Sequence, residues 1–100
     1  MYDMKNLSRF GKLSEVAPEG FKAFVAFDAA AFAAGTVPLK FKELMAVAVG
    51  VTTQCPYCIE IHAAKARKAG ATDQELAETT LVAAALRAGG AMTHGTHALA

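Results

Sequence analysis

The chain has 100 residues, of which 54% are hydrophobic and only 19% are charged, and its formal net charge is +1. This near neutrality, without a cluster of lysine and arginine, excludes nucleic-acid binding that relies on concentrated positive charge. No stretch has the roughly eighteen uninterrupted apolar residues of a membrane-spanning helix, so the apolar excess of so short a chain predicts an obligate homo-oligomer that buries apolar faces between subunits.

The N-terminal stretch MYDMKNLSRFGKL has scattered charges and no apolar centre. It is typical of neither a secretory signal nor a membrane anchor, so we expect a cytoplasmic protein. No linker, repeat or block of like charge divides the sequence. We therefore expect a single domain, residues 1–100.

Three helices are expected in the first half of the chain, because alanine, the strongest helix former, dominates the apolar content. They cover residues 7–16, residues 18 to about 34 and residues 39 to about 52. Proline is well placed in the opening turn of a helix, and Pro18 and Pro38 stand where the second and third helices begin.

Two more helices follow. The fourth is expected to begin near Cys55, with Pro56 in its first turn, and to end at Gly70, and the fifth runs from Asp73 to about residue 88. The sequence TDQE at positions 72–75 has the capping-box pattern, in which the side chains of the first and fourth residues satisfy each other's backbone N–H groups. It predicts a sharp start for the fifth helix.

Gly89 and Gly90 are expected to kink or interrupt the fifth helix before a last segment through His97. No segment has the alternating β-branched pattern of a strand. The sequence therefore predicts an all-α bundle of about five to six helices.

Two cysteines and a histidine stand close together in the stretch QCPYCIEIH. On a helix, the spacing of Cys55, Cys58 and His62 places all three on one face near the N-terminal end. The free N–H groups and positive dipole there stabilise a thiolate, which is the reactive form of cysteine, and an imidazole can relay protons. The stretch thus predicts a reactive dithiol.

Other interpretations of the cysteine pair have to be weighed. A structural zinc site needs four ligands, so His94 or His97 would have to complete it. Two inert buried cysteines would leave the histidine unexplained. A glutaredoxin-like site, suggested by CPYC, requires flanking strands and a later proline, and the sequence after Cys58 is helix-like without proline; we reject it.

Glu43 lies twelve positions before Cys55 in an otherwise apolar segment. If the third and fourth helices pack as an antiparallel pair, its carboxylate faces the cysteines in a low-dielectric region and can act as a base. The neighbouring Lys40 and Lys42 favour a solvated face instead. Both interpretations stay open at this point.

The segment KELMAVAVGVTTQCPYCIEIHAAKARKAGATDQELAE resembles the carboxymuconolactone decarboxylase superfamily, specifically its alkyl hydroperoxidase D-like branch. The branch is marked by a glutamate, a CxxC pair and a histidine four residues on, which Glu43, Cys55, Cys58 and His62 match. The resemblance implies an all-helical fold assembled as trimers or hexamers, without metal or other cofactor.

The resemblance also implies a thiol-dependent peroxidase or disulfide reductase. Cys58 attacks the peroxide, Cys55 resolves the sulfenic acid to a disulfide, and Glu43 and His62 relay protons. The partners expected are a small hydroperoxide or disulfide substrate and an external dithiol reductant.

The pair between the cysteines, Pro56 and Tyr57, departs from the well-studied members of the branch, so neither substrate nor reductant follows from the resemblance. A redox-sensing or zinc-holding oligomer, or a decarboxylase-type enzyme on the same fold, stay as alternatives. His94 and His97 are interpreted as interface or surface residues.

Overall fold

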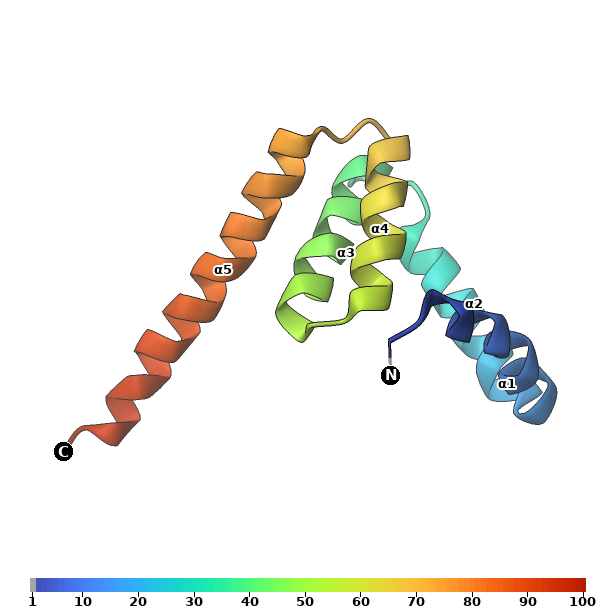
Figure 1. Cartoon of the computed structure of the whole chain (residues 1–100), viewed down its shortest axis with the longest axis horizontal. Coiled ribbons are helices and arrows are strands. Elements are labelled where there is room, and N and C mark those ends of the chain that lie inside the picture. The colour runs from blue at the N-terminus through green and yellow to red at the C-terminus, as the bar shows by residue number, and fades with distance from the viewer. Residues whose placement is uncertain (1) are drawn as a thin grey trace. The chain divides into compact units, whose positions relative to one another are not determined.

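A computed structural model describes residues 2–100, and within them every regular element is a helix, which confirms the all-α prediction (Figure 1). The residues form two compact units, one up to Leu39 and one from Lys40 onward. The expectation of one domain stays a prediction. The elements are η1 (Met4–Arg9), α1 (Phe10–Val16), α2 (Pro18–Phe32), α3 (Leu39–Thr53), α4 (Pro56–Lys68), α5 (Asp73–Gly95) and η2 (Thr96–Ala98).

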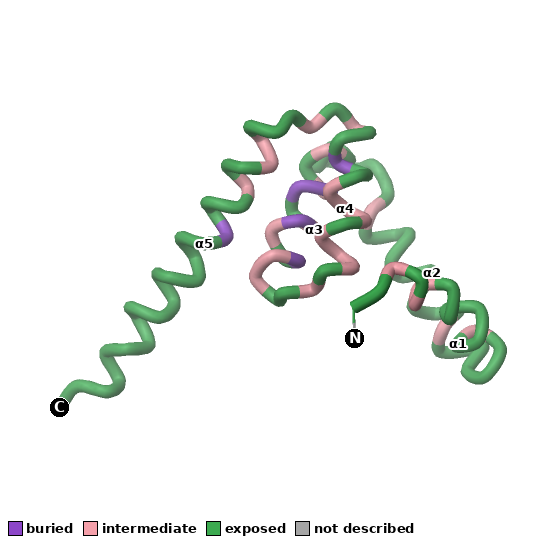
Figure 2. Tube along the Cα trace, in the orientation of Figure 1, coloured by how far each residue is buried: buried purple, intermediate pink, exposed green. Residues whose placement is uncertain are grey.

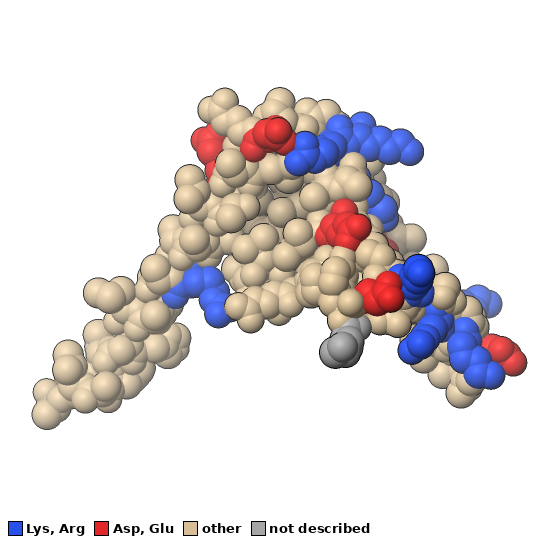
Figure 3. Space-filling view, in the orientation of Figure 1, with Lys and Arg blue, Asp and Glu red and all other residues tan. Residues whose placement is uncertain are grey.

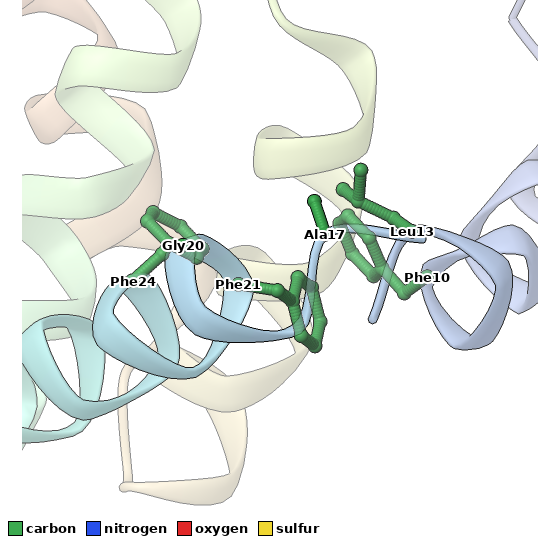
Figure 4. Close-up of a pocket in the computed structure, with 6 residues that line it drawn as sticks. All are labelled: Phe10, Leu13, Ala17, Gly20, Phe21 and Phe24. Atoms are coloured by element: carbon green, nitrogen blue, oxygen red, sulfur yellow. The ribbon is translucent and has the colours of Figure 1, made fainter. Parts of the chain in front are cut away.

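The first unit begins earlier than predicted, because a 3-10 helix precedes α1. The Asp3 side chain caps it by accepting a hydrogen bond from the Lys5 N–H at 2.9 Å. Helices α1 and α2 then pack through Phe10 and Phe21, whose ring centroids are 5.7 Å apart. An apolar pocket of about 370 Å³ lies between them (Figure 4). Its lining has no ionisable group and consists of Phe10, Leu13, Ala17, Gly20, Phe21 and Phe24.

The second unit is built on α3 and α4, which run antiparallel and are joined by a tight turn (Figure 1). At the end of α3, the Cys55 N–H bonds to the Gly50 carbonyl at 3.0 Å and the Gln54 N–H to the Val51 carbonyl at 3.3 Å. These two bonds form the Schellman arrangement that ends many helices. Gln54 takes the left-handed position, with φ of 57°, that glycine usually occupies.

Close packing of α3 on α4 depends on Gly50. A Cβ atom at this position would lie 3.2 Å from the Cβ of Cys58 and 3.4 Å from the backbone nitrogen of Ile59. Real Cβ contacts are rarely this short, so any side chain here would push α4 away. Because Gly50 has no side chain, the backbones of α3 and α4 can approach closely at the start of α4.

The connection from α4 to α5 is fixed by its own hydrogen bonds. Gly70, with φ of 100°, ends α4 in a second Schellman arrangement. The predicted capping box is confirmed, because Thr72 Oγ1 accepts from the Glu75 N–H at 3.1 Å and Glu75 Oε1 accepts from the Thr72 N–H at 3.0 Å. Glu75 also pairs with Lys40 at 2.9 Å, which ties the start of α5 to the start of α3.

The predicted interruption at Gly89 and Gly90 is wrong, because α5 continues without a break to Gly95. A glycine in a helix costs only about 1 kcal/mol relative to alanine, and the flanking residues are alanines and Met92. That cost is too small to end a helix that is already nucleated by a capping box. A short 3-10 turn, η2, follows directly.

The buried core of the chain is small (Figure 2). Each of the helices α1, α2, α3 and α5 instead has large apolar side chains that are exposed. On α5, for example, Met92 is 78% exposed and Leu86 is 68% exposed. No helix within residues 2–100 is long and apolar enough to cross a membrane. The buried hydrophobic residues are Leu44, Val47, Ala66 and Ala83.

Candidate active site

A buried carboxylate on α3 contacts α4, the helix whose N-terminal end carries the two cysteines. Glu43 is only 4% exposed, and its Oε2 lies 2.6 Å from Nδ1 of His62 on α4. An ionised carboxylate only accepts hydrogen bonds, so Nδ1 carries the shared proton. The contact becomes an ion pair when the imidazole is protonated. Glu43 is therefore not on a solvated face, despite its lysine neighbours.

The two cysteines lie at the N-terminal end of α4, and both are free thiols. Cys55 is the N-cap of α4 rather than a residue within it, and its Sγ accepts a hydrogen bond from the Cys58 N–H at 3.3 Å. The sequence predicted a helix that begins near Cys55, and the structure places its first residue at Pro56. As a cap, its sulfur points back over the first turn toward Cys58.

One side of the α3–α4 pair carries three of the four predicted residues, Glu43, Cys58 and His62. On α3, Glu43 and Gly50 are seven residues apart, which is two helical turns, so they share a face. On α4, Cys58 and His62 are one turn apart, a rise of about 6 Å. Gly50 would contact Cys58 and Glu43 contacts His62, so these two faces meet each other.

The two thiols differ in acidity because of the cap. Hydrogen bonds from the Cys58 side chain and the Cys58 backbone N–H lower the pKa of Cys55 below that of an ordinary thiol. Donation of that same hydrogen bond to Cys55, together with burial and the charge on Cys55, raises the pKa of Cys58. The hydrogen bond that Cys55 Sγ accepts from the Cys58 N–H thus favours the thiolate form on Cys55 over that on Cys58.

The other two histidines form a separate pair. His94, near the end of α5, and His97, in η2, are both exposed and have ring centroids 5.9 Å apart. Nδ1 of His94 lies 3.1 Å from the Gly90 carbonyl oxygen. Across residues 2–100, no three His, Cys, Asp or Glu side chains converge to hold a metal ion. Within one chain, these histidines thus do not complete a zinc site with the cysteines.

Two residues important for this geometry were missed by sequence analysis. Gly50 was counted as part of the apolar α3 segment, although an isolated glycine in a helix often marks a close approach. Arg87 on α5 donates a hydrogen bond from Nη1 to the Thr52 carbonyl at 2.5 Å. No local pattern indicates a contact between residues that lie 35 positions apart.

The family model for the carboxymuconolactone decarboxylase family matches residues 18–100. A Paracoccus denitrificans protein, called uncharacterized protein 4 in cox locus, is 42% identical over 96 residues, covering 96% of this chain and 86% of its own. An uncharacterized protein of Cupriavidus necator is 33% identical over 92 residues, covering 92% of this chain and 81% of its own.

Two crystal structures are similar to this chain. One, of a Methanobacterium thermoautotrophicum protein, has a TM-score of 0.83 and 36% identity, covering 88% of this chain and 99% of that one. The other, of a carboxymuconolactone decarboxylase family protein from Legionella pneumophila, has a TM-score of 0.77 and 34% identity, covering 82% of this chain and 73% of that one.

The difference in acidity between the thiols can be measured by limited alkylation with iodoacetamide and peptide mass analysis. We expect Cys55 to be alkylated first at neutral pH, because only the thiolate reacts. The midpoint of its rate–pH curve should lie below the pKa of an ordinary thiol. Cys58→Ala removes the side-chain donor and should move the Cys55 midpoint to higher pH. Cys58→Ser keeps a hydroxyl donor and should move it less. Faster labelling of Cys58 in the wild-type protein would contradict this order.

Proposed function

We propose that this chain, which belongs to the carboxymuconolactone decarboxylase family, is a thiol-dependent peroxidase or disulfide reductase that works through the Cys55–Cys58 pair. The observation that supports this most is the buried Glu43 carboxylate, 2.6 Å from the imidazole that follows Cys58 by one turn. A carboxylate is costly to bury without a partner. Here it has one, and the partner lies on the face of α4 that also carries a thiol.

Glu43 and His62 serve as the base of the reaction. Glu43 holds the proton on Nδ1 and so orients the ring, and His62 exchanges protons with the thiol through its other nitrogen, Nε2. The negative charge of the carboxylate stabilises the imidazolium that forms. Cys58 needs such a base, because its pKa is raised by its hydrogen bond to Cys55, by burial and by the charge on Cys55.

The first step oxidises Cys58. Its proton passes to His62, and the thiolate attacks the terminal oxygen of a hydroperoxide, so an S–O bond forms while the O–O bond breaks. The alkoxide that leaves takes up the proton from His62 and departs as an alcohol. The peroxide is reduced by two electrons, and Cys58 becomes a sulfenic acid.

The second step uses Cys55. Its thiolate, favoured by the lowered pKa that the Cys58 hydrogen bonds produce, attacks the sulfenic sulfur, and hydroxide leaves and is protonated to water. The product is a disulfide between the two residues. An external dithiol restores both thiols by exchange and is itself oxidised to a disulfide. A small disulfide can replace the hydroperoxide as the oxidant.

The opposite assignment, with Cys55 as the attacking thiol, is favoured by the same difference in acidity if no base acts on Cys58. The two assignments predict different trapped species. With Cys58 attacking, Cys55→Ser accumulates a sulfenic acid on Cys58 and Cys58→Ser is inert to peroxide. With Cys55 attacking, the two variants exchange these behaviours.

We further propose that the chain is a homo-oligomer in the cytoplasm. A groove of about 280 Å³ between α3 and α5 is lined by apolar side chains and one threonine. In it, Phe41, Met45 and Val82 are 48%, 50% and 60% exposed. From Ala88 to the end of α5 the sequence has no Lys, Arg, Asp or Glu, and this end of the helix shows neither blue nor red side chains in Figure 3. A second copy with the same surface is the occupant that matches it.

The alternatives to the peroxidase differ in what they predict. A redox sensor would form the disulfide without turnover. A zinc-holding oligomer would have to draw ligands from several subunits, since no three-ligand group exists in residues 2–100 of one chain. A decarboxylase-type enzyme on the same fold would not depend on the thiols.

The function is tested by adding organic hydroperoxide to the reduced protein and then supplying a dithiol for turnover. One equivalent of peroxide should remove two thiols and two mass units per chain without adding oxygen. Glu43→Gln should slow this oxidation by about a hundredfold, the scale of one lost general base, while the helical circular dichroism is kept. Glu60→Gln, on the exposed face of α4, is the matched control. Thiols that survive the peroxide would refute the proposal.

Light scattering tests the oligomer. A mass that is a multiple of 10.4 kDa is expected across a wide concentration range, because the single chain buries few apolar side chains. Met45→Glu or Val82→Glu should shift the mass toward the monomer by placing a charge in the α3–α5 groove. A stable wild-type monomer would contradict the proposal.

A further inference from the structure

We propose that Arg87 is a positioning residue of the dithiol, which holds the turn on which Cys55 caps α4 by donating a hydrogen bond to the carbonyl oxygen at the end of α3. The effect on turnover rests on the proposed function. The effect on the geometry and reactivity of the thiols does not, and it can be measured separately.

The end of α3 leaves backbone carbonyls that need partners. Those of Gly50 and Val51 accept from the N–H groups of Cys55 and Gln54. The Thr52 carbonyl has no such partner within the turn, and Nη1 of Arg87 donates to it at 2.5 Å. A cation at this position also complements the negative end of the α3 dipole.

The turn itself is strained, so a hydrogen bond from outside it, such as that of Arg87, helps to hold its conformation. Gln54 has φ of 57°, a conformation that residues other than glycine and asparagine rarely adopt. Strained backbone of this kind persists only when surrounding contacts over-determine it. Cys55 follows immediately and has an extended backbone, with φ of −99° and ψ of 97°, that aims its sulfur at the Cys58 N–H. Any relaxation at Gln54 therefore moves this sulfur.

Arg87 occupies the side of α5 that faces the rest of its unit. The half-buried Leu76 and Thr79, the buried Ala83 and then Arg87 recur at intervals of three and four, which places them on one stripe of the helix. From residue 79 to the end of the chain, Arg87 is the only charged residue. Arg87 is itself exposed, and its guanidinium, at the end of this otherwise uncharged stripe, donates a hydrogen bond to the Thr52 carbonyl.

The experiment measures the pH dependence of Cys55 alkylation in the full-length protein. Arg87→Met keeps a long side chain but removes the donors, and Arg87→Lys restores a donor and the charge without the planar guanidinium. Lys68→Met, at the exposed C-terminal end of α4, is the matched control for the loss of one positive charge. Circular dichroism and light scattering check the fold and the assembly of every variant.

We expect Arg87→Met to slow Cys55 alkylation at pH 7 by roughly three- to tenfold. The relaxed turn weakens the hydrogen bond that stabilises the Cys55 thiolate, and a rise of about one unit in the Cys55 pKa lowers the thiolate fraction about tenfold. At high pH, where the thiol is ionised in every variant, the rates should converge. Arg87→Lys should lie between Arg87→Met and wild type, and Lys68→Met should match wild type.

Gln54→Gly provides a second, independent variant. Glycine adopts the left-handed conformation without strain, so the turn then depends less on the Arg87 hydrogen bond. In the Gln54→Gly background, Arg87→Met should therefore lose most of its effect on Cys55 alkylation. A general structural role would not give this rescue. Unchanged alkylation in a folded Arg87→Met protein, or an equal loss with and without Gln54→Gly, would overturn the proposal. Neither result depends on whether the protein reduces peroxides.

Discussion

The hydrogen bond between Glu43 and His62 is the interaction on which the arrangement of the site depends. A carboxylate that is 4% exposed must have a partner, because an isolated buried charge is far more costly than a paired one. The partner lies on the next helix, so the pair also sets how α3 and α4 align. With Glu43 opposite His62, the side-chain-free position Gly50 comes to lie against Cys58. A single polar contact and a single glycine together bring the Glu43–His62 pair and the Cys58 thiol to one face.

The turn before α4 makes the two cysteines chemically unequal. Because Cys55 is the cap, its sulfur receives the Cys58 N–H, and the thiols become unequal. A low-pKa thiol is well suited to resolve a sulfenic acid and to leave during reduction, whereas a thiol with a higher pKa is the better nucleophile once a base has removed its proton. His62, the hydrogen-bond partner of Glu43, follows Cys58 by one turn on the same face of α4.

Local signals in the sequence were sufficient for most of the fold. Helix starts and ends were predictable from Pro18, Gly70 and the capping box of Thr72, since capping is decided within a few residues. The continuous α5 was not, because the small cost of two glycines does not outweigh a long helix. The spacing of the site residues was also predictable, but not the burial of Glu43, the close approach at Gly50 or the Arg87 contact. These three features depend on how α3, α4 and α5 pack against one another, which the sequence of a single segment does not determine.

The central claim is tested most directly by nuclear magnetic resonance of the His62 ring in reduced protein labelled with ¹⁵N-histidine. A long-range ¹H–¹⁵N correlation distinguishes which ring nitrogen carries the proton. The account predicts a proton on Nδ1, shifted strongly downfield and slow to exchange with water, that disappears in Glu43→Ala. A His62 ring protonated only on Nε2, or one whose signals are the same with and without the Glu43 carboxylate, would contradict it.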